Sequence, residues 1–485
     1  MTQTARMIEA RMLIGGELVE AKSGKWIDSL NPATEELIGR FPHGDQADVN
    51  AAVEAADAAQ PAWGAMSASD RGHLLRNVAM ALRKRGEEVL RVEVMDTGNT
   101  ISKMKGDVEH AAHAIEYFAG LGAEIKGETV PASSDNIHIT VREPFGVVGR
   151  IVPFNHPLKF AAHALAAPLM AGNTVVVKPP EQSSLSAGIL AEICKQELPP
   201  GVVNIVTGYG LGAGDAIVRH PKIKRIAFTG SVPTGLAIQR SAAQVSVKHV
   251  TLELGGKNPL IAFPDQDPEK IASVAVQAMN FAWQGQSCGS ASRLLLHETI
   301  YDAVLEKLLA KVKAINLGDP LDPNAQMGPL NSLAHYKRVC SMVDVGIADG
   351  AKLLTGGKRP AGKIFEKGYW LQPTVFGDVT SNMRIAQEEI FGPILSVMRW
   401  KDEEEAFRIA NSTEYGLTAS IWTNDIKAAM RAARAVKSGY IWINNNSAHY
   451  YGMPFGGFKN SGLGREEGLD ELLSYTENKS IHIKL

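Results

Sequence analysis

The sequence of 485 residues contains only three cysteines, Cys194, Cys288 and Cys340. Their number is odd, and their wide separation does not match the short spacings between the ligands of a structural zinc site. A disulfide scaffold and a bound metal are therefore not expected. Such sparse cysteine usage favours a reducing compartment, and we expect a cytoplasmic protein.

Long apolar runs are also missing from the sequence. A membrane span needs about 18 consecutive apolar residues, and the apolar stretch 160–170 is short, rich in alanine and interrupted by His163. Residues 1–20 include acidic side chains and lack the apolar core of a signal peptide. We expect neither a membrane partner nor secretion, and we interpret the stretch 160–170 as a buried helix.

The sequence also has no large excess of basic or acidic residues. The chain has 50 basic and 52 acidic residues, which gives a formal net charge of -2. Proteins that bind nucleic acids or anionic membranes usually carry clustered Lys and Arg, and no such cluster occurs here. A nucleic-acid partner is therefore not expected.

Short apolar strands alternate with helical segments through most of the chain. Residues 49–91 have helical spacing, with Asp70 in the position of an N-cap, and residues 108–119 predict a second helix. From residue 147 onward, strands, turns and helices repeat, and a second such series runs from about residue 261 to 447. This alternation predicts an α/β fold with parallel sheets, which bind ligands at the carboxyl ends of their strands.

Cys288 differs from the other two cysteines in its surroundings. It lies in the turn Gln284-Gly-Gln-Ser-Cys288-Gly-Ser, where small and polar residues leave a thiol approachable. Cys194 and Cys340 fit the usual interpretation of a small buried side chain. We therefore expect Cys288 to be a nucleophile.

Two further segments suggest partners for that thiol. In Thr251-Leu-Glu253-Leu-Gly-Gly-Lys257 a carboxylate precedes a double glycine, where backbone can approach a ligand closely. In Phe228-Thr-Gly230-Ser231-Val-Pro-Thr-Gly235 a strand leads through a glycine turn into a helix start, which suits a pyrophosphate. Taken alone, Glu253 also fits a solvated surface residue, and the glycine turn also fits an ordinary connection.

Together with Pro153-Phe-Asn155-His-Pro and Glu388-Glu389-Ile-Phe391-Gly-Pro, these segments resemble the aldehyde dehydrogenase superfamily, from about Asn31 to the C-terminus. The resemblance implies a Rossmann-like cofactor domain, an α/β catalytic domain and a small β oligomerisation element. The expected ranges are 1–122 and 145–256 for the NAD(P)-binding domain, 257–455 for the catalytic domain, and 123–144 with 456–485 for the bridging element.

The resemblance also implies catalytic roles. Cys288 matches the family nucleophile, and Asn155 matches the amide that holds the oxyanion together with the Cys288 backbone N–H. Glu253 matches the general base for the hydrolytic water, and Glu466 matches a carboxylate proposed as a second proton relay. The implied reaction is oxidation of an aldehyde to its carboxylate through a thioester.

Several residues match the family's cofactor site. Lys178 and Glu181 match contacts to the adenine ribose, and a carboxylate at Glu181 should favour NAD over NADP by repelling a 2′-phosphate. NAD is therefore the expected cofactor, with NADP as the alternative. The remaining matches are the pyrophosphate residues Gly230 and Ser231, the nicotinamide residues Glu389 and Phe391, and Phe154, which replaces the family's usual Trp.

The expected substrate tunnel departs from the family pattern. Histidines stand at positions where many relatives have aromatic rings, which favours a substrate with a ring and a polar substituent, such as a substituted benzaldehyde. The alternative interpretation is that the imidazoles only fill space. The tunnel residues are His156, His163, Ala282, His449 and Tyr450.

The resemblance also bears on partners and on competing functions. Arg465 and Glu477 match a pair near a subunit interface, and the alternating tail 474–485 resembles an edge strand, so a homodimer or homotetramer is expected. An acylating dehydrogenase that uses coenzyme A is the nearest alternative, although it needs no general base. A phosphorylating enzyme is a weaker alternative, because no residues beyond the family set suggest a second anion site. A catalytically silent scaffold is also weaker, because Cys288, Asn155 and Glu253 are all present.

Overall fold

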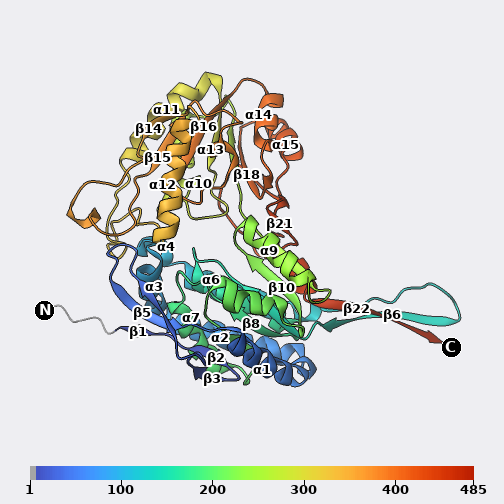
Figure 1. Ribbon diagram of the computed structural model, residues 1–485. Coiled ribbons are helices and arrows are strands. Elements are labelled where there is room, and N and C mark those ends of the chain that lie inside the picture. The colour runs from blue at the N-terminus through green and yellow to red at the C-terminus, as the bar shows by residue number, and fades with distance from the viewer. Residues whose placement is uncertain (1–6) are drawn as a thin grey trace.

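A computed structural model describes residues 7–485, so the first six residues of the expected cofactor domain lie outside the described part. Two large sheets dominate this part of the chain, one in each lobe of the molecule (Figure 1). Both sheets are mainly parallel and alternate with helices, so the predicted α/β fold is confirmed. No helix among residues 7–485 has both the length and the apolar character needed to cross a membrane.

The sheet of the lower lobe in Figure 1 has eight strands, of which the central five, β11, β10, β7, β8 and β9, run parallel. In order across the sheet the strands are β21 (Gly462–Leu463), β11 (His249–Glu253), β10 (Ile223–Thr229), β7 (Val147–Ile151), β8 (Thr174–Lys178), β9 (Val203–Ile205), β2 (Met12–Ile14) and β3 (Glu17–Val19).

Both faces of this sheet are buried, which explains the continuous apolar runs of its strands. Along β7, Val148 packs into one core and Val147 and Ile151 pack into the core on the other face. Helices contribute to both cores. They are α1 (Gln46–Ala65), α2 (Ala68–Lys84), α3 (Gly86–Thr97), α5 (Asp107–Gly120), α6 (Pro157–Met170), α7 (Leu185–Glu197), α8 (Asp215–Arg219) and α9 (Val232–Ala243). The short helix α4 (Ile101–Met104) packs with α3 in a small separate core.

The long helical segment predicted over residues 49–91 divides into α1, α2 and the start of α3. The N-cap predicted at Asp70 is wrong. Ser67 is the cap, and its hydroxyl accepts the backbone N–H of Asp70 at 3.1 Å while donating to the Asp70 carboxylate at 2.7 Å. Asp70 instead lies in the first turn, where a negative charge stabilises the positive end of the helix dipole.

The sheet of the upper lobe has seven strands, parallel except at the edge strand β14. In order they are β14 (Lys352–Thr355), β15 (Thr374–Gly377), β16 (Ile394–Trp400), β13 (Arg293–His297), β12 (Pro259–Ala262), β18 (Thr418–Trp422) and β19 (Tyr440–Ile443). Its helices are α10 (Pro268–Ala278), α11 (Glu298–Lys313), α12 (Leu333–Ala348), α13 (Arg384–Gln387), α14 (Glu403–Asn411) and α15 (Ile426–Ala435), with the 3-10 turn η3 (Phe281–Trp283) after α10.

Smaller sheets complete the described chain. The predicted tail strand forms β22 (Thr476–Lys484), which pairs antiparallel with β6 (Asn136–Pro144) and projects away from both lobes (Figure 1). The short helix α16 (Leu469–Leu473) precedes it. The other small strands are β1 (Ile8–Glu9), β4 (Trp26–Leu30), β5 (Leu37–Pro42), β17 (Tyr415–Gly416) and β20 (Phe458–Lys459).

Candidate active site

A cleft of about 870 Å³ opens where the carboxyl ends of β7, β8, β10 and β11 face loops of the seven-stranded sheet. Parallel strands that end at one edge bring residues distant in sequence together, so this is the edge at which ligands bind. All of the sequence-predicted cofactor residues and most of the catalytic ones line this cleft. They are Phe154, Asn155, Lys178, Glu181, Gly230, Ser231, Glu253, Cys288, Glu389 and Phe391.

Cys288 lies in the loop between η3 and β13 and is partly exposed to the cleft. Its side chain packs against an aromatic cluster of Tyr440, Trp442 and Phe455. Burial, together with the nearby carboxyls of Glu389 and Glu253, raises the pKa of Cys288 to about 12. The resting group at neutral pH is therefore the thiol, and proton removal must accompany nucleophilic attack.

The other two cysteines differ from Cys288. Cys194 is buried in α7, and its burial raises the pKa of the thiol to about 12. Cys340, on α12, packs partly buried against the core of the seven-stranded sheet. Both agree with the interpretation of small packed side chains, because neither lines the cleft.

Asn155 follows β7 and is buried at the floor of the cleft. One amide N–H donates to the carbonyl of Gln286 at 3.0 Å, and the second hydrogen of the amide remains available to an anionic oxygen. The backbone carbonyl of Asn155 accepts a hydrogen bond from Asn99 Nδ2 at 2.8 Å. These contacts hold the amide in place before any ligand arrives, as an oxyanion-binding group requires.

The helix after Asn155, α6, begins against a buried carboxyl. The backbone N–H of Leu158 donates to Glu93 at 3.3 Å, and the Ser186 hydroxyl donates to the same carboxyl. Burial raises the pKa of Glu93 to about 8. A carboxyl at this position satisfies a free N–H in the first turn and fixes where the helix starts.

Glu253 is the last residue of β11 and is buried. Neither of its carboxyl oxygens has a hydrogen-bond partner among residues 7–485. Burial raises the pKa of Glu253 well above its usual range, the charge on Glu466 raises it further, and Arg465 opposes the rise. A buried carboxyl with no partner, aimed into a cleft, is suited to bind and deprotonate a water molecule.

Other residues of the cleft lining are suited to bind a dinucleotide. Lys178 Nζ donates to Glu181 at 3.0 Å and to the carbonyl of Pro179 at 2.9 Å, so the carboxylate of Glu181 is fixed at the cleft surface. Gly230 and Ser231 connect β10 to the first turn of α9, whose free N–H groups favour an anion.

Glu389 and Phe391 come from the loop before β16. The carboxyl of Glu389 accepts the backbone N–H of Gly256 at 3.0 Å, and burial raises its pKa to about 7. Phe391 has a positive φ of 56°, and its ring packs edge-to-face on Phe154 with centroids 5.7 Å apart.

Sequence reasoning missed two residues of α12 that hold this loop. His335 Nε2 donates to the carbonyl of Phe391 at 2.7 Å, and burial lowers the pKa of His335 to about 4, so the ring is neutral. Arg338 donates to the carbonyls of Glu389 at 2.7 Å and Ile390 at 3.0 Å. Both residues line the cleft, but their helix gives no motif, and only the fold places them against residues 389–391.

The predicted tunnel residues lie outside the lining of the cleft. Two of the histidines are buried against carboxyls: His156 Nδ1 lies 2.6 Å from Asp107, and His163 Nε2 lies 3.4 Å from Glu471. Ala282 lies in η3, and Tyr450 is 59% exposed.

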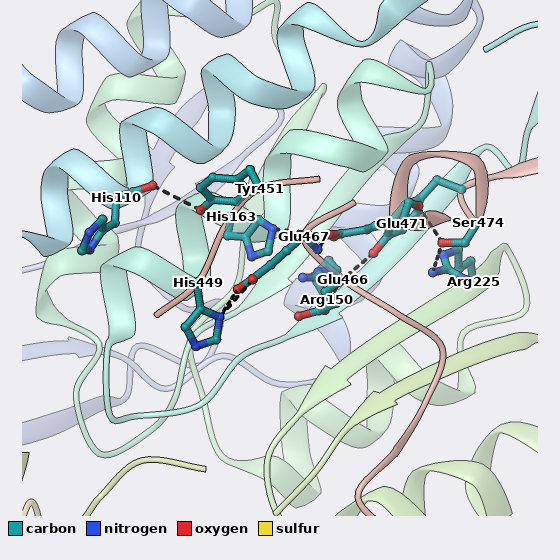
Figure 2. A network of polar contacts seen from close by, with 11 residues as sticks. His110, Arg150, His163, Arg225, His449, Tyr451, Glu466, Glu467, Glu471 and Ser474 are labelled. Atoms are coloured by element: carbon teal, nitrogen blue, oxygen red, sulfur yellow. Dashed lines mark hydrogen bonds and ion pairs between the residues drawn. The ribbon is translucent and has the colours of Figure 1, made fainter. Parts of the chain in front are cut away.

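The third histidine, His449, lies nearer the nucleophile. It contacts Glu467 at 3.0 Å (Figure 2), stacks on Tyr440 and packs on Phe455, both of which belong to the cluster that contacts Cys288. The role of all five residues in a substrate tunnel stays a prediction.

Glu466 also lies outside the cleft lining, in a buried charged cluster shown in Figure 2. Arg150 Nη1 donates to Glu466 at 3.3 Å and to the hydroxyl of Tyr475 at 2.6 Å. Burial raises the pKa of Glu466, while Arg150 opposes the rise. Since the charge on Glu466 acts on Glu253, the two carboxyls are electrostatically linked.

Comparisons with known proteins agree with this geometry. Residues 18–481 match the model of the aldehyde dehydrogenase family. The chain belongs to this family. Aldehyde dehydrogenase tropH of Talaromyces stipitatus is 45% identical over 465 residues, which cover 94% of this chain and 90% of the relative.

Solved structures of similar proteins have the same fold. PnpE from Pseudomonas sp. WBC-3 superposes with a TM-score of 0.96 at 40% identity, over 98% of each chain. The NAD+ complex of an aldehyde dehydrogenase from Bacillus cereus has a TM-score of 0.95 at 39% identity, over 98% of this chain and 97% of the relative. The aldehyde dehydrogenase fold predicted from the sequence is thereby confirmed.

Proposed function

We propose that this aldehyde dehydrogenase oxidises its substrate to a carboxylate with NAD, through a thioester on Cys288. The observation that carries the proposal is that Cys288, Asn155 and Glu253 line one cleft together with every residue predicted to bind the cofactor. Nucleophile, oxyanion donor, base and cofactor site are the parts that this reaction needs.

The donor set of the cleft fits NAD. Its volume of about 870 Å³ is in the range of cofactor pockets, and the start of α9 offers backbone N–H groups to a pyrophosphate. The carboxylate of Glu181 is available to accept hydrogen bonds from ribose hydroxyls and would repel a 2′-phosphate, which favours NAD over NADP. When bound, NAD supplies the two-electron oxidising equivalent.

In the first half of the reaction, the Cys288 thiol gives its proton to a water molecule of the cleft as the sulfur forms a bond to the aldehyde carbon, and the electron pair of the C=O bond moves onto the oxygen. The free amide hydrogen of Asn155 and the backbone N–H of Cys288 stabilise that oxygen. Loss of one such donor typically costs about 100- to 1000-fold in rate. Oxidation of the resulting thiohemiacetal leaves a thioester on Cys288.

In the second half, Glu253 takes a proton from a water molecule, whose oxygen attacks the thioester carbon. The C–S bond breaks, the carboxylate product leaves, and the thiol is restored. The charge on Glu466 raises the pKa of Glu253. We therefore assign Glu466 the role of accepting the proton from Glu253 and passing it away from the site. Because Glu253 is buried and has no hydrogen-bond partner among residues 7–485, hydrolysis is favoured over transfer to coenzyme A.

The side chains around Cys288 favour a ring-bearing substrate. The aromatic cluster of Tyr440, Trp442 and Phe455 contacts the nucleophile, and aromatic pairs add about 0.5–1.5 kcal/mol beyond their burial. We therefore propose an aromatic aldehyde with a polar substituent, of the benzaldehyde type.

The test is reduction of NAD and NADP by the purified protein with short aliphatic, semialdehyde and substituted aromatic aldehydes, without coenzyme A. We expect turnover with NAD that disappears in Cys288→Ala and falls about 100- to 1000-fold in Asn155→Ala. Turnover that starts only when coenzyme A is added would show the acylating reaction instead. A protein that is folded and binds NAD but oxidises no aldehyde would contradict the proposal.

We also propose the division into a cofactor domain (1–122 and 145–256), a catalytic domain (257–455) and a bridging element (123–144 and 456–485). Two observations support this division. The eight-stranded sheet is built mainly from the first ranges and the seven-stranded sheet from the second, while β6 and β22 form a ribbon outside both lobes. One strand departs from this division, because β21 joins the edge of the eight-stranded sheet. The projecting ribbon supports a homodimer or homotetramer, and a monomer by light scattering would contradict that assembly.

A further inference from the structure

Asn99 is an almost fully buried amide that does not itself line the cleft. It follows α3, whose C-cap Gly98 has a positive φ of 79°. A Cβ atom at Gly98 would lie 2.9 Å from both Pro32 and Pro329, so only glycine allows the chain to turn at this point. The backbone N–H of Asn99 donates to the Thr97 hydroxyl at 3.1 Å. The end of α3 therefore places the Asn99 side chain at a fixed point.

The side chain of Asn99 contacts both loops that carry the proposed oxyanion donors. Its Nδ2 donates to the backbone carbonyl of Asn155 at 2.8 Å. Its Oδ1 accepts a hydrogen bond at 3.0 Å from the side-chain amide of Gln284, which lies in the same loop as Cys288. This orientation of the Gln284 amide also lets its oxygen accept the backbone N–H of Gly328 at 3.2 Å, whereas in the reverse orientation its nitrogen would face that N–H. One buried amide therefore joins the Asn155 loop to the Cys288 loop.

A third hydrogen bond joins the same two loops directly. Asn155 Nδ2 donates at 3.0 Å to the backbone carbonyl of Gln286, which lies shortly before Cys288. Together with the two bonds of Asn99 it closes a triangle of neutral amides, in which Asn99 is 1% exposed, Gln284 0% and Gln286 2%. Because water does not reach these amides, their hydrogen bonds cannot be exchanged for bonds to solvent, and the triangle holds one geometry.

Helix α3 also holds the other end of the Asn155 loop. Glu93 of α3 accepts the backbone N–H of Leu158 at 3.3 Å. The segment between β7 and α6 is thus bonded to residues of α3 or its C-terminal end at both Asn155 and Leu158. A change at Asn99 removes only the first of these contacts, so α6 keeps the contact that fixes its start.

The two proposed oxyanion donors come from the two joined loops. One is the free amide hydrogen of Asn155, and the other is the backbone N–H of Cys288. Because these residues lie far apart in the sequence, their separation depends on contacts between the loops and not on local geometry. Donors stabilise a developing charge only when they are in place beforehand, and a misplacement of about 1 Å can cost about 100-fold in rate.

We infer that Asn99 is a positioning residue that holds the Asn155 amide and the Cys288 backbone N–H at the separation that an oxyanion requires. The inference rests on the proposed function and adds to it a residue outside the cleft lining. Loss of Asn99 should therefore slow the chemical steps and leave cofactor binding unchanged.

The experiment measures kcat with the best aldehyde of the panel, and the Kd for NAD, in Asn99→Ala and Asn99→Asp. The first variant loses both side-chain bonds, and the second keeps the size of the side chain but cannot donate to the Asn155 carbonyl. We expect kcat to fall about 10- to 100-fold in both variants. The Kd for NAD, measured by fluorescence titration, should stay as in the wild type.

Asn204 of β9, outside the cleft lining, offers a matched control. It is also buried, its Nδ2 donates to the carbonyl of Gly201 at 2.8 Å, and its Oδ1 accepts the backbone N–H of Gly15 at 2.9 Å. Asn204→Ala should therefore lower Tm about as much as Asn99→Ala does, but it should leave kcat as in the wild type.

Two results would overturn the inference. One is a wild-type kcat in Asn99→Ala. The other is an equal loss of kcat in Asn99→Ala and Asn204→Ala, which would show only a general effect of lower stability.

A double variant tests whether Asn99 acts through Asn155. Asn155→Ala removes the donor that Asn99 holds, so adding Asn99→Ala to it should lower kcat much less than Asn99→Ala does in the wild type. Losses of kcat that multiply would show that Asn99 acts elsewhere and would contradict the inference.

Failure of the proposed function gives a different result. If the protein oxidises no aldehyde, hydrolysis of 4-nitrophenyl acetate without NAD still tests the pair of oxyanion donors. In that reaction the Cys288 thiol gives its proton to water, its sulfur forms a bond to the ester carbon, and 4-nitrophenolate leaves. Water then attacks the thioester, acetate is released and the thiol is restored.

The rate of 4-nitrophenolate release, followed by absorbance, should be about 10- to 100-fold lower in Asn99→Ala and unchanged in Asn204→Ala. Equal rates in the wild type and in Asn99→Ala would contradict the inference. No release by the folded wild type would also contradict it, because the loops would then hold no working oxyanion site.

Discussion

Asn258 Nδ2 donates a hydrogen bond to the backbone carbonyl of Cys288 at 2.7 Å and another to the carbonyl of Ser290 at 3.0 Å. Its Oδ1 accepts the backbone N–H of Thr418 at 3.1 Å. Asn258 is buried directly before β12, so one amide joins the Cys288 loop to two central strands of the seven-stranded sheet. The position of the nucleophile therefore depends on a residue outside the cleft lining.

Replacing Asn258 should disturb the Cys288 loop. In Asn258→Ala, two carbonyls and one N–H lose their partners, and each buried unsatisfied group costs about 1–3 kcal/mol. We expect kcat to fall about 10- to 100-fold while the Kd for NAD, measured by fluorescence titration, changes little. Asn258→Asp keeps the size of the side chain but cannot donate to the carbonyls, so it should show the same loss. Full kcat in Asn258→Asp would contradict this role.

The pH profile should show an alkaline optimum. Burial raises the pKa of Cys288 to about 12, so this thiol holds its proton at neutral pH, and burial also raises the pKa of Glu253. Since attack and hydrolysis need the deprotonated forms, kcat/KM should rise with pH above about pH 7. A profile that is flat or falls over this range would contradict the burial of the two groups.

Substitution of Glu253 should separate the two halves of the reaction. Glu253→Gln cannot take a proton from water, so the thioester should accumulate after one NADH has formed at each site. Stopped-flow absorbance should show that burst, followed by steady turnover reduced about 100- to 10,000-fold. Loss of both the burst and the turnover would instead show that Glu253 is needed to form the thioester.

Glu181 should control the choice of cofactor. In Glu181→Ser the carboxylate that faces the predicted ribose site is removed, and Lys178, which now contacts it at 3.0 Å, becomes available to a phosphate. We expect the ratio of kcat/KM for NADP to that for NAD to rise about 10- to 100-fold. Glu388→Ser, another carboxylate of the cleft lining, is the control and should leave the ratio unchanged.

Glu93 should make the stability of the protein depend on pH. Its folded pKa of about 8 lies above the usual value of 4.5, so between these values the folded state holds a proton that the unfolded state has lost. The free energy of unfolding therefore falls by about 5 kcal/mol for this group as pH rises from 4.5 to 8, and it stays level above pH 8. Glu93→Gln, which does not titrate, should show a shallower fall of Tm in this window, and an unchanged slope would contradict the prediction.

The motifs and the strand ends were predictable because they depend on short-range patterns. The apolar run 174–178 and the glycine turn after residue 229 indicated two strands that end at one edge, and the structure confirms both. The N-cap at residue 70 was wrong by three positions. Ser67 and Asp70 are both good capping residues, and only the hydrogen bond between them shows which one precedes the helix.

The sequence by itself determined the family, the α/β alternation and the residues that carry the chemistry, because a thiol in a glycine turn and a carboxyl at a strand end are local features. Only the tertiary structure decided which charges find partners. The pairings of His156 with Asp107 and of His163 with Glu471 join segments far apart in the chain, whereas the ammonium of Lys257 is buried with no hydrogen-bond partner among residues 7–485. Such pairing depends on distances between elements, which packing sets and no local pattern encodes.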